Sequence, residues 1–159
     1  MITLVLDTNF WEEAASCSIS DALSLLHKIK SDQSLTIGLD HENNIMNEYM
    51  NRRCNKFIQL WIYNIFGKKP SGLNYQSSDL DNKIELKLKI LKFDTSDLPF
   101  VGLALNTSKC IVTEDSDYGK GHNLKAKETS KQAVLDYLTT TLQMKLYNFN
   151  EAYKKFCQA

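Results

Sequence analysis

Residues 4–9 read Leu-Val-Leu-Asp-Thr-Asn, a short apolar run that ends on a carboxylate. Residues 110–115 repeat this pattern with Cys-Ile-Val-Thr-Glu-Asp. Apolar runs with little alternation are typical of strands that are covered on both faces, as in a parallel sheet. The carboxyl ends of parallel strands meet at one edge of the sheet, where α/β proteins bind ligands. We therefore expect Asp7 and Asp115 to lie at the same edge.

The rest of the pattern predicts one α/β domain over residues 1–159. Strands are expected at 2–7, 35–40, 110–114 and 143–147. Helices are expected after the first strand with Thr8 or Asn9 as the cap, from Ser20 or Asp21 to Lys30, and from near Ile45 to Phe66. Further helices are expected over 84–93, from Asp97 with Thr95 or Ser96 as its cap, over 128–139 and over 150–156. The alternation in 84–93 also fits a half-exposed strand, and 67–82 is expected to be a loop and the best candidate for a mobile segment. This order predicts a three-layer α/β/α fold with a central, mainly parallel sheet of four or five strands.

The charge balance argues against a generic nucleic-acid binder. Nineteen basic residues match nineteen acidic residues, so there is no global positive field. Only Arg52 and Arg53 are arginines, and with Lys56 they form a small basic cluster. We take Arg52, Arg53 and Lys56 as candidate RNA-binding residues, although charge clusters are usually solvated surface.

Cysteine and histidine spacing indicates neither a zinc site nor a disulfide framework. The four cysteines lie far apart without a C-x-x-C pair, and the three histidines lack ligand spacing. No apolar run approaches the roughly 20 residues that span a bilayer, and the first residues do not resemble a signal peptide. We therefore expect a cytoplasmic protein with no membrane partner.

Two more acids lie where the predicted fold would bring them to the edge that holds Asp7 and Asp115. Glu48 stands near the start of the helix after the second strand, and Asp97 stands in the first turn of a later helix. Clustered carboxylates are required to hold two Mg²⁺ or Mn²⁺ ions about 4 Å apart for phosphodiester hydrolysis. Oxygen ligands suit these hard ions. The four acids therefore predict a metal-dependent nuclease site.

Four segments carry these acids in an order that spans most of the chain, from Ile2 to Tyr118. They are Asp7-Thr8-Asn9 after an apolar strand, Asn47-Glu48-Tyr49, the run from Asp97 to Ala104, and the run from Val112 to Tyr118. In this order they resemble the PIN domain family, the metal-dependent ribonucleases of toxin–antitoxin systems, RNA processing and RNA quality control.

The resemblance implies an endoribonuclease that leaves a 5′-phosphate and a 3′-hydroxyl. Its implied catalytic and metal-binding acids are Asp7, Glu48, Asp97 and Asp115, with Asp117 as an auxiliary metal ligand and with Asn9 and Thr113 positioning ligands or water. Two Mg²⁺ or Mn²⁺ ions per site, an RNA substrate, a toxin or defence role, a homodimer and a protein antitoxin are implied by the same analogy. Single-stranded DNA stays open as a substrate.

The sequence departs from the family pattern around the second and third acids. Asp40 and Glu42 lie close to Glu48, and Asp94 lies close to Asp97, so each of these neighbours competes for a place in the acidic set.

Other interpretations explain the acids one at a time. An aspartate after a strand often caps a helix, and an acid in a first helical turn is stabilised without any function. A phosphohydrolase would need an Asp-x-Asp at the first strand, which Asp7-Thr8-Asn9 lacks, and the acidic pair and late lysine of a phosphotransfer receiver are not evident. The stronger alternative is a catalytically silent PIN-like module that binds RNA or protein through residues 57–66, which are either core or a subunit interface.

Overall fold

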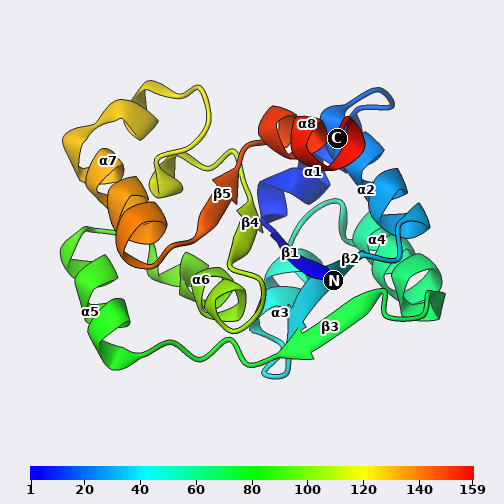
Figure 1. Ribbon diagram of the computed structural model, residues 1–159, viewed down its shortest axis with the longest axis horizontal. Coiled ribbons are helices and arrows are strands. Elements are labelled where there is room, and N and C mark those ends of the chain that lie inside the picture. The colour runs from blue at the N-terminus through cyan, green and yellow to red at the C-terminus, as the bar shows by residue number, and fades with distance from the viewer.

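The structure, a computed structural model, describes all 159 residues. Five strands form one sheet in the order β3-β2-β1-β4-β5, and every neighbouring pair is parallel. The strands are β1 (Ile2–Leu6), β2 (Leu35–Asp40), β3 (Leu73–Gln76), β4 (Cys110–Val112) and β5 (Lys145–Tyr147). In Figure 1, α1, α2 and α8 gather on one side of the sheet and α6 lies on the other. The predicted three-layer α/β/α fold is confirmed, with a sheet that is parallel throughout.

The helices follow the predicted order along the chain. They are α1 (Thr8–Ser16), α2 (Asp21–Ser31), α3 (Asn44–Met50), α4 (Asn55–Gln59), α5 (Asn82–Ile90), α6 (Leu98–Leu105), α7 (Thr129–Asp136) and α8 (Phe149–Cys157). Shorter 3₁₀ turns cover Phe66–Lys68, Thr95–Asp97, Ser116–Tyr118 and Leu124–Lys127, and π-helical turns cover Leu60–Ile65 and Tyr137–Thr141. The helical interpretation of residues 84–93 is confirmed by α5. No helix of the chain is both long and apolar enough to cross a membrane.

The prediction of an uninterrupted loop over 67–82 is wrong, because β3 lies within it. β3 pairs with β2 at the edge of the sheet, with Leu73 opposite Ile37. Its side chains are half-buried or exposed, so the strand carries no apolar run that sequence reasoning could detect. Backbone pairing and a hydrogen bond from Asn74 Nδ2 to Thr3 Oγ1 (2.9 Å) hold it instead.

The predicted long helix from Ile45 to Phe66 is interrupted between Met50 and Asn55. A turn over 51–54 separates α3 from α4, and the π-helical turn that follows α4 changes which side chains face the core. Ile58, Trp61, Ile62 and Phe66 are buried there, whereas Leu60 is 49% and Tyr63 53% exposed. The segment 57–66 is therefore mainly core, with two apolar side chains left at the surface.

Several helices and turns are capped at other residues than predicted. Capping residues are polar, so the apolar pattern that predicts a helix does not fix where its cap lies. Asp7 rather than Thr8 or Asn9 caps α1, and Asp94 rather than Thr95 or Ser96 caps the turn before α6. Asn148 caps α8 in a capping box with Glu151, so this helix begins at Phe149.

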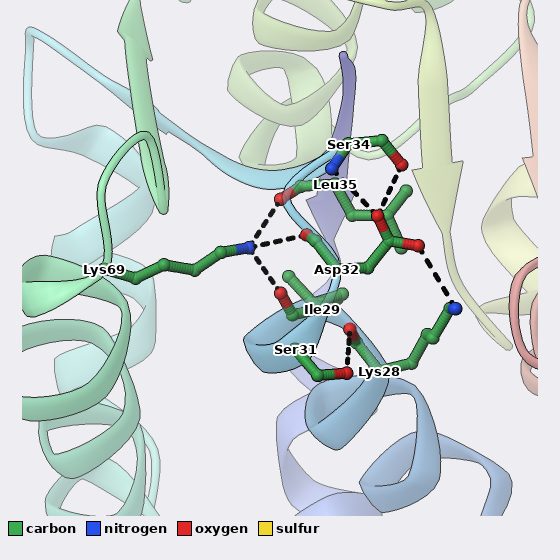
Figure 2. Close-up of polar contacts among 7 residues, drawn as sticks. All are labelled: Lys28, Ile29, Ser31, Asp32, Ser34, Leu35 and Lys69. Carbon is green, nitrogen blue, oxygen red and sulfur yellow. Dashed lines mark hydrogen bonds and ion pairs between the residues drawn. The ribbon is translucent and has the colours of Figure 1, made fainter.

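Lys69 fixes the loop between the π-helical turn and β3 to the end of α2. Its ammonium donates to the carbonyl oxygens of Ile29 (2.5 Å), Asp32 (2.7 Å) and Leu35 (3.0 Å), as Figure 2 shows. A cation is favourable at the carboxyl end of a helix, where carbonyls lack partners. Burial lowers the pKa of Lys69, and the charge of Asp32 opposes this shift. This contact places the entry to β2 beside the entry to β3.

Candidate acidic site

Asp7 leaves β1 at the centre of the sheet and is 1% exposed. Its Oδ1 accepts from the backbone N–H of Thr8 (2.7 Å), and its Oδ2 accepts from the hydroxyl of Thr113 (2.6 Å). The pKa of Asp7 is raised to about 6. Burial is the main cause, the hydrogen bond from Thr113 acts against it, and the charge of Asp115 acts with it. Asp7 is thus both a helix cap and a buried carboxylate beside a second acid.

Thr113 connects Asp7 to Asp115. The Asp115 N–H donates to Thr113 Oγ1 (2.9 Å), so the hydroxyl accepts from one strand-end acid and donates to the other. Asp115 caps the 3₁₀ turn Ser116–Tyr118, because its Oδ1 accepts from the N–H of Asp117 (2.8 Å). The Oδ2 atom of Asp115 receives no protein hydrogen bond. Thr113 thus makes hydrogen bonds to both strand-end acids, and its predicted role in positioning ligands or water stays a prediction.

Asp97 lies at the start of α6, and its carboxylate makes no capping hydrogen bond. The pKa of Asp97 is raised to about 8, mainly by burial and then by the charges of Asp7, Asp115, Asp94 and Asp117 in that order. These causes require that the five carboxylates lie within electrostatic reach of one another. Asp97 therefore lies near Asp7 and Asp115, two of the three acids with which it was predicted to share a site.

Two tyrosines that sequence reasoning left without a role border this cluster. Tyr118 is fully buried, its hydroxyl has no hydrogen-bond partner, and its pKa is raised by burial and by four of the cluster carboxylates. Tyr49 is also buried and donates its hydroxyl to the carbonyl of Leu6, next to Asp7. Their positions directly after acidic motifs were the available signal, since Tyr49 follows Glu48 and Tyr118 follows Asp117.

Glu48 occupies a different environment from the aspartates. Its side chain is 36% exposed, and its Oε2 lies 3.9 Å from Arg52 Nη2. Arg52 also reaches Glu12, with 3.6 Å between Nη1 and Oε1. Glu48 is not among the charges that raise the pKa of Asp97. The structure thus places the second predicted acid in an ion pair with an arginine.

The two acids that compete with Glu48 are held by structural hydrogen bonds. Asp40 accepts from the first two backbone N–H groups of α3, those of Asn44 (2.9 Å) and Ile45 (3.0 Å), and it also accepts from the Ser78 hydroxyl (2.8 Å). Glu42 accepts from the N–H of Ser78 (3.0 Å), which is the main reason that its pKa is lowered to about 2.

Asp94 and Asp117 lie close to Asp97 but are also engaged. Asp94 Oδ1 accepts from the N–H and the hydroxyl of Ser96 (both 2.9 Å). Asp117 accepts from the ammonium of Lys131 at Oδ1 and from the Asp94 N–H at Oδ2 (2.7 Å). Both oxygens of the predicted auxiliary ligand therefore have protein partners.

The largest hollow of the surface lies beside α1 and the turn 51–54 rather than over the acids. It measures about 680 Å³ and is lined by Glu12, Ala15, Ser16, Asn51, Arg52, Arg53, Cys54 and Phe57. A second hollow of about 540 Å³ shares Glu12 and Ser16 and reaches Asn9, whose Oδ1 accepts from the Glu114 N–H (3.4 Å). Arg52 and Arg53, two of the candidate RNA-binding residues, thus line the larger hollow. The third candidate, Lys56, is exposed but does not line it.

The donor chemistry at the strand ends suits a hard divalent cation, although the ligands are not preassembled. No group of three or more His, Cys, Asp or Glu side chains is placed so that it could hold a metal ion. The Asp97 carboxylate and the buried Tyr118 hydroxyl both lack partners, and excess negative charge surrounds them. A cation would relieve that charge once the carboxylates turn toward it.

Comparison with known proteins identifies no relative of the chain. No protein-family model matches the chain, and no curated protein or solved structure matches it significantly.

Proposed function

We propose that the chain is a divalent-metal-dependent endoribonuclease of the PIN type. The observation that carries this proposal is Asp97, a carboxylate without a hydrogen-bond partner whose pKa is raised to about 8 by burial and four neighbouring acids. Perturbed carboxylates at the carboxyl edge of a parallel sheet are characteristic of functional sites. Helix capping explains Asp7 and Asp115 but leaves Asp97 without a structural purpose.

Asp7, Asp97 and Asp115 are the residues that would hold Mg²⁺ or Mn²⁺. When bound, such ions supply an activated water for in-line attack on phosphorus and stabilise the leaving 3′-oxygen. Because a carboxylate binds a metal in its charged form, loading the site would release the proton that Asp97 holds at neutral pH. Thr113 would keep the Asp7 carboxylate in a fixed orientation through its 2.6 Å hydrogen bond.

Glu48 would complete the acidic quartet only after leaving Arg52. Both side chains are about two-fifths exposed and 3.9 Å apart, and such a surface pair stabilises by about 1 kcal/mol or less. The free energy lost when Glu48 leaves Arg52 is therefore small compared with the binding free energy of a divalent cation in a carboxylate site.

RNA would be held by Arg53 and Lys56, which are exposed and have no ion-pair partner in the chain. The planar guanidinium of Arg53 can bind a phosphate through two hydrogen bonds. Arg52 would contribute less, because two glutamates already neutralise it. A toxin or defence role, a homodimer and an antitoxin partner belong to this proposal through the family resemblance alone.

One observation favours the silent-module alternative. Leu60 and Tyr63 are about half exposed on the segment that follows α4, where an apolar partner surface could cover them. In that case the acids would be structural and the protein would bind without cleaving.

Cleavage assays test the choice between these functions. Single-stranded RNAs of mixed sequence and the matching DNAs are incubated with wild type in Mn²⁺, in Mg²⁺ and in EDTA, and product ends are mapped. We expect cleavage that requires metal, leaves 5′-phosphates and is lost in Asp7→Asn and Asp115→Asn. Asp136→Asn, an exposed acid on α7, is the control and should retain activity. Cleavage in EDTA, or full activity of both site variants, would refute the mechanism, and binding without cleavage would establish the silent module.

A further inference from the structure

We infer that Lys131 and Asp117 form a buried pair that positions Asp97 against Asp115, so that Asp117 acts as a positioning residue and not as a metal ligand. The catalytic meaning of this pair rests on the proposed nuclease function. Its structural role does not, because it follows from hydrogen bonds that join two turns at the acidic site.

Lys131 is an unusual residue for the interior of the protein. It is 5% exposed and lies on the buried side of α7 with Val134. Its ammonium donates to Asp117 Oδ1 and to the carbonyl oxygen of Lys92 (3.2 Å). A buried ammonium is retained only where charged and polar partners replace its water. Here those partners come from two separate segments of the chain.

Asp117 transmits this contact to the turn that carries Asp97. Its Oδ2 accepts from the N–H of Asp94 (2.7 Å), and the Asp94 carbonyl accepts from the N–H of Asp97 (3.1 Å). Its own N–H donates to Asp115 Oδ1 (2.8 Å). One residue therefore connects the segment 92–97 to the segment 113–118, and each segment delivers one acid of the proposed site.

The backbone on both sides is shaped for this arrangement. Gly119 has φ +76°, and a Cβ there would lie 2.7 Å from the Lys131 carbonyl oxygen, so only glycine lets α7 come this close. Lys92 adopts φ +60°, a conformation that non-glycine residues seldom take. Its carbonyl is one of the two acceptors of the Lys131 ammonium. Figure 1 shows α7 beside the segment that follows β4.

The ion pair with Lys131 also affects whether Asp117 can bind a metal ion. Lys131 is the cation paired with one member of a cluster of five aspartates, and it uses the Asp117 oxygen that Asp94 leaves free. The ammonium of Lys131 already neutralises the Asp117 carboxylate, whereas the donors to Asp7 are the uncharged N–H of Thr8 and hydroxyl of Thr113. A divalent cation would therefore have to displace a buried cation to bind Asp117. The ligands are then drawn from Asp7, Asp97 and Asp115, with Glu48 joining from outside.

The test compares three variants in metal-free protein by amide hydrogen exchange. Lys131→Met removes the ammonium, and the double variant Asp117→Asn/Lys131→Met removes both charges so that no lone carboxylate is buried. Lys127→Met removes an exposed lysine four residues earlier in the chain and serves as the control. We expect exchange over 92–97 to accelerate by about tenfold or more in the first two variants, with no change over β2. Lys127→Met should match wild type. Unchanged exchange over 92–97 in the double variant overturns the inference.

Calorimetric Mn²⁺ titration then tests the link to the site. We expect the double variant, still folded, to bind Mn²⁺ about tenfold more weakly than wild type, because Asp97 is no longer held against Asp115. Unchanged Mn²⁺ affinity together with faster exchange would overturn the positioning role. If wild type itself binds no Mn²⁺, the proposed nuclease function fails, and the exchange data still decide whether the pair anchors the turn.

Discussion

The acids at the ends of β1 and β4 differ from the acid on α3 in one physical respect. Asp7 and Asp115 emerge from central strands, so the fold itself buries or half-buries them side by side, and the charge of Asp115 helps to raise the pKa of Asp7. Glu48 lies on a helix surface, where an arginine one turn away pairs with it. A strand end in a parallel sheet therefore dictates where its carboxylate lies, whereas a helix position leaves a long side chain free to choose its partner.

The largest difference between the two regions should appear when each acid is neutralised. Asp97→Asn removes a carboxylate that has no structural hydrogen bond, so we expect at least about a 100-fold loss of RNA cleavage with the fold intact, because losing a metal ligand costs more than losing its outer partners. Glu48→Gln should cost about tenfold, because Glu48 contributes only when it leaves Arg52. The measurement is kcat/KM on one RNA at saturating Mn²⁺. Equal losses in the two variants would show that Glu48 belongs to the cluster as fully as Asp97.

The hydroxyl of Thr113 should matter next, since it joins the two strand-end acids. Thr113→Val keeps the shape but removes the bond to Asp7 and the acceptor for the Asp115 N–H. We expect Mn²⁺ affinity to fall by about tenfold, as for other residues that orient metal ligands. Thr36→Val is a matched control, because the Thr36 hydroxyl is buried without a partner and its loss should leave affinity unchanged. Equal affinities in all three proteins would remove Thr113 from the site.

The raised pKa of Asp97 predicts a pH dependence of stability in metal-free protein. The folded-state pKa of about 8 exceeds the unfolded value of about 3.9, so the folded state holds an extra proton between these limits. The free energy of unfolding should therefore fall as pH rises from about 4 to about 8, and Asp7 adds a component of the same sign up to about 6.

Asp97→Asn should remove the part of this slope that lies between pH 6 and 8, and it should make the protein more stable than wild type at pH 8. Urea unfolding at pH 5, 6.5 and 8 in EDTA measures both effects. An identical slope in wild type and Asp97→Asn would show that Asp97 is ionised in the folded protein and that the acids do not crowd one another.

The two regions also explain what the sequence could predict. Buried strands such as 4–6 and 110–112 consist almost entirely of apolar residues, which is a pattern visible in the sequence. The parallel sheet and the acids that follow those strands can therefore be predicted. β3 was missed because an edge strand is held by backbone pairing that leaves no apolar pattern. The pairing of Glu48 was missed because a long side chain on a helix has several partners in reach.

Lys131 shows a signal that was present but unused. It stands three residues before Val134 and seven before Leu138, on the stripe that faces the core. A lysine in such a stripe implies a buried anion nearby, and Asp117 is that anion. What periodicity could not supply is which acid it meets, because that contact joins residues 14 apart through the close approach at Gly119.

The smallest expected effect concerns Arg52, which holds Glu48 away from the other acids. Arg52→Met frees Glu48 and removes a positive charge, so we expect Mn²⁺ affinity to rise, by about fivefold at most, since the pair stabilises by no more than about 1 kcal/mol. Arg53→Met removes the same charge from the neighbouring position without touching Glu48, so it should leave Mn²⁺ affinity nearly unchanged and weaken RNA binding instead. Calorimetry with Mn²⁺ and RNA binding in EDTA separate the two arginines. A rise in Mn²⁺ affinity of the same size in both variants would mean that the loss of positive charge, and not the release of Glu48, is responsible. Glu48 on α3 would then contribute nothing to metal binding by the strand-end acids.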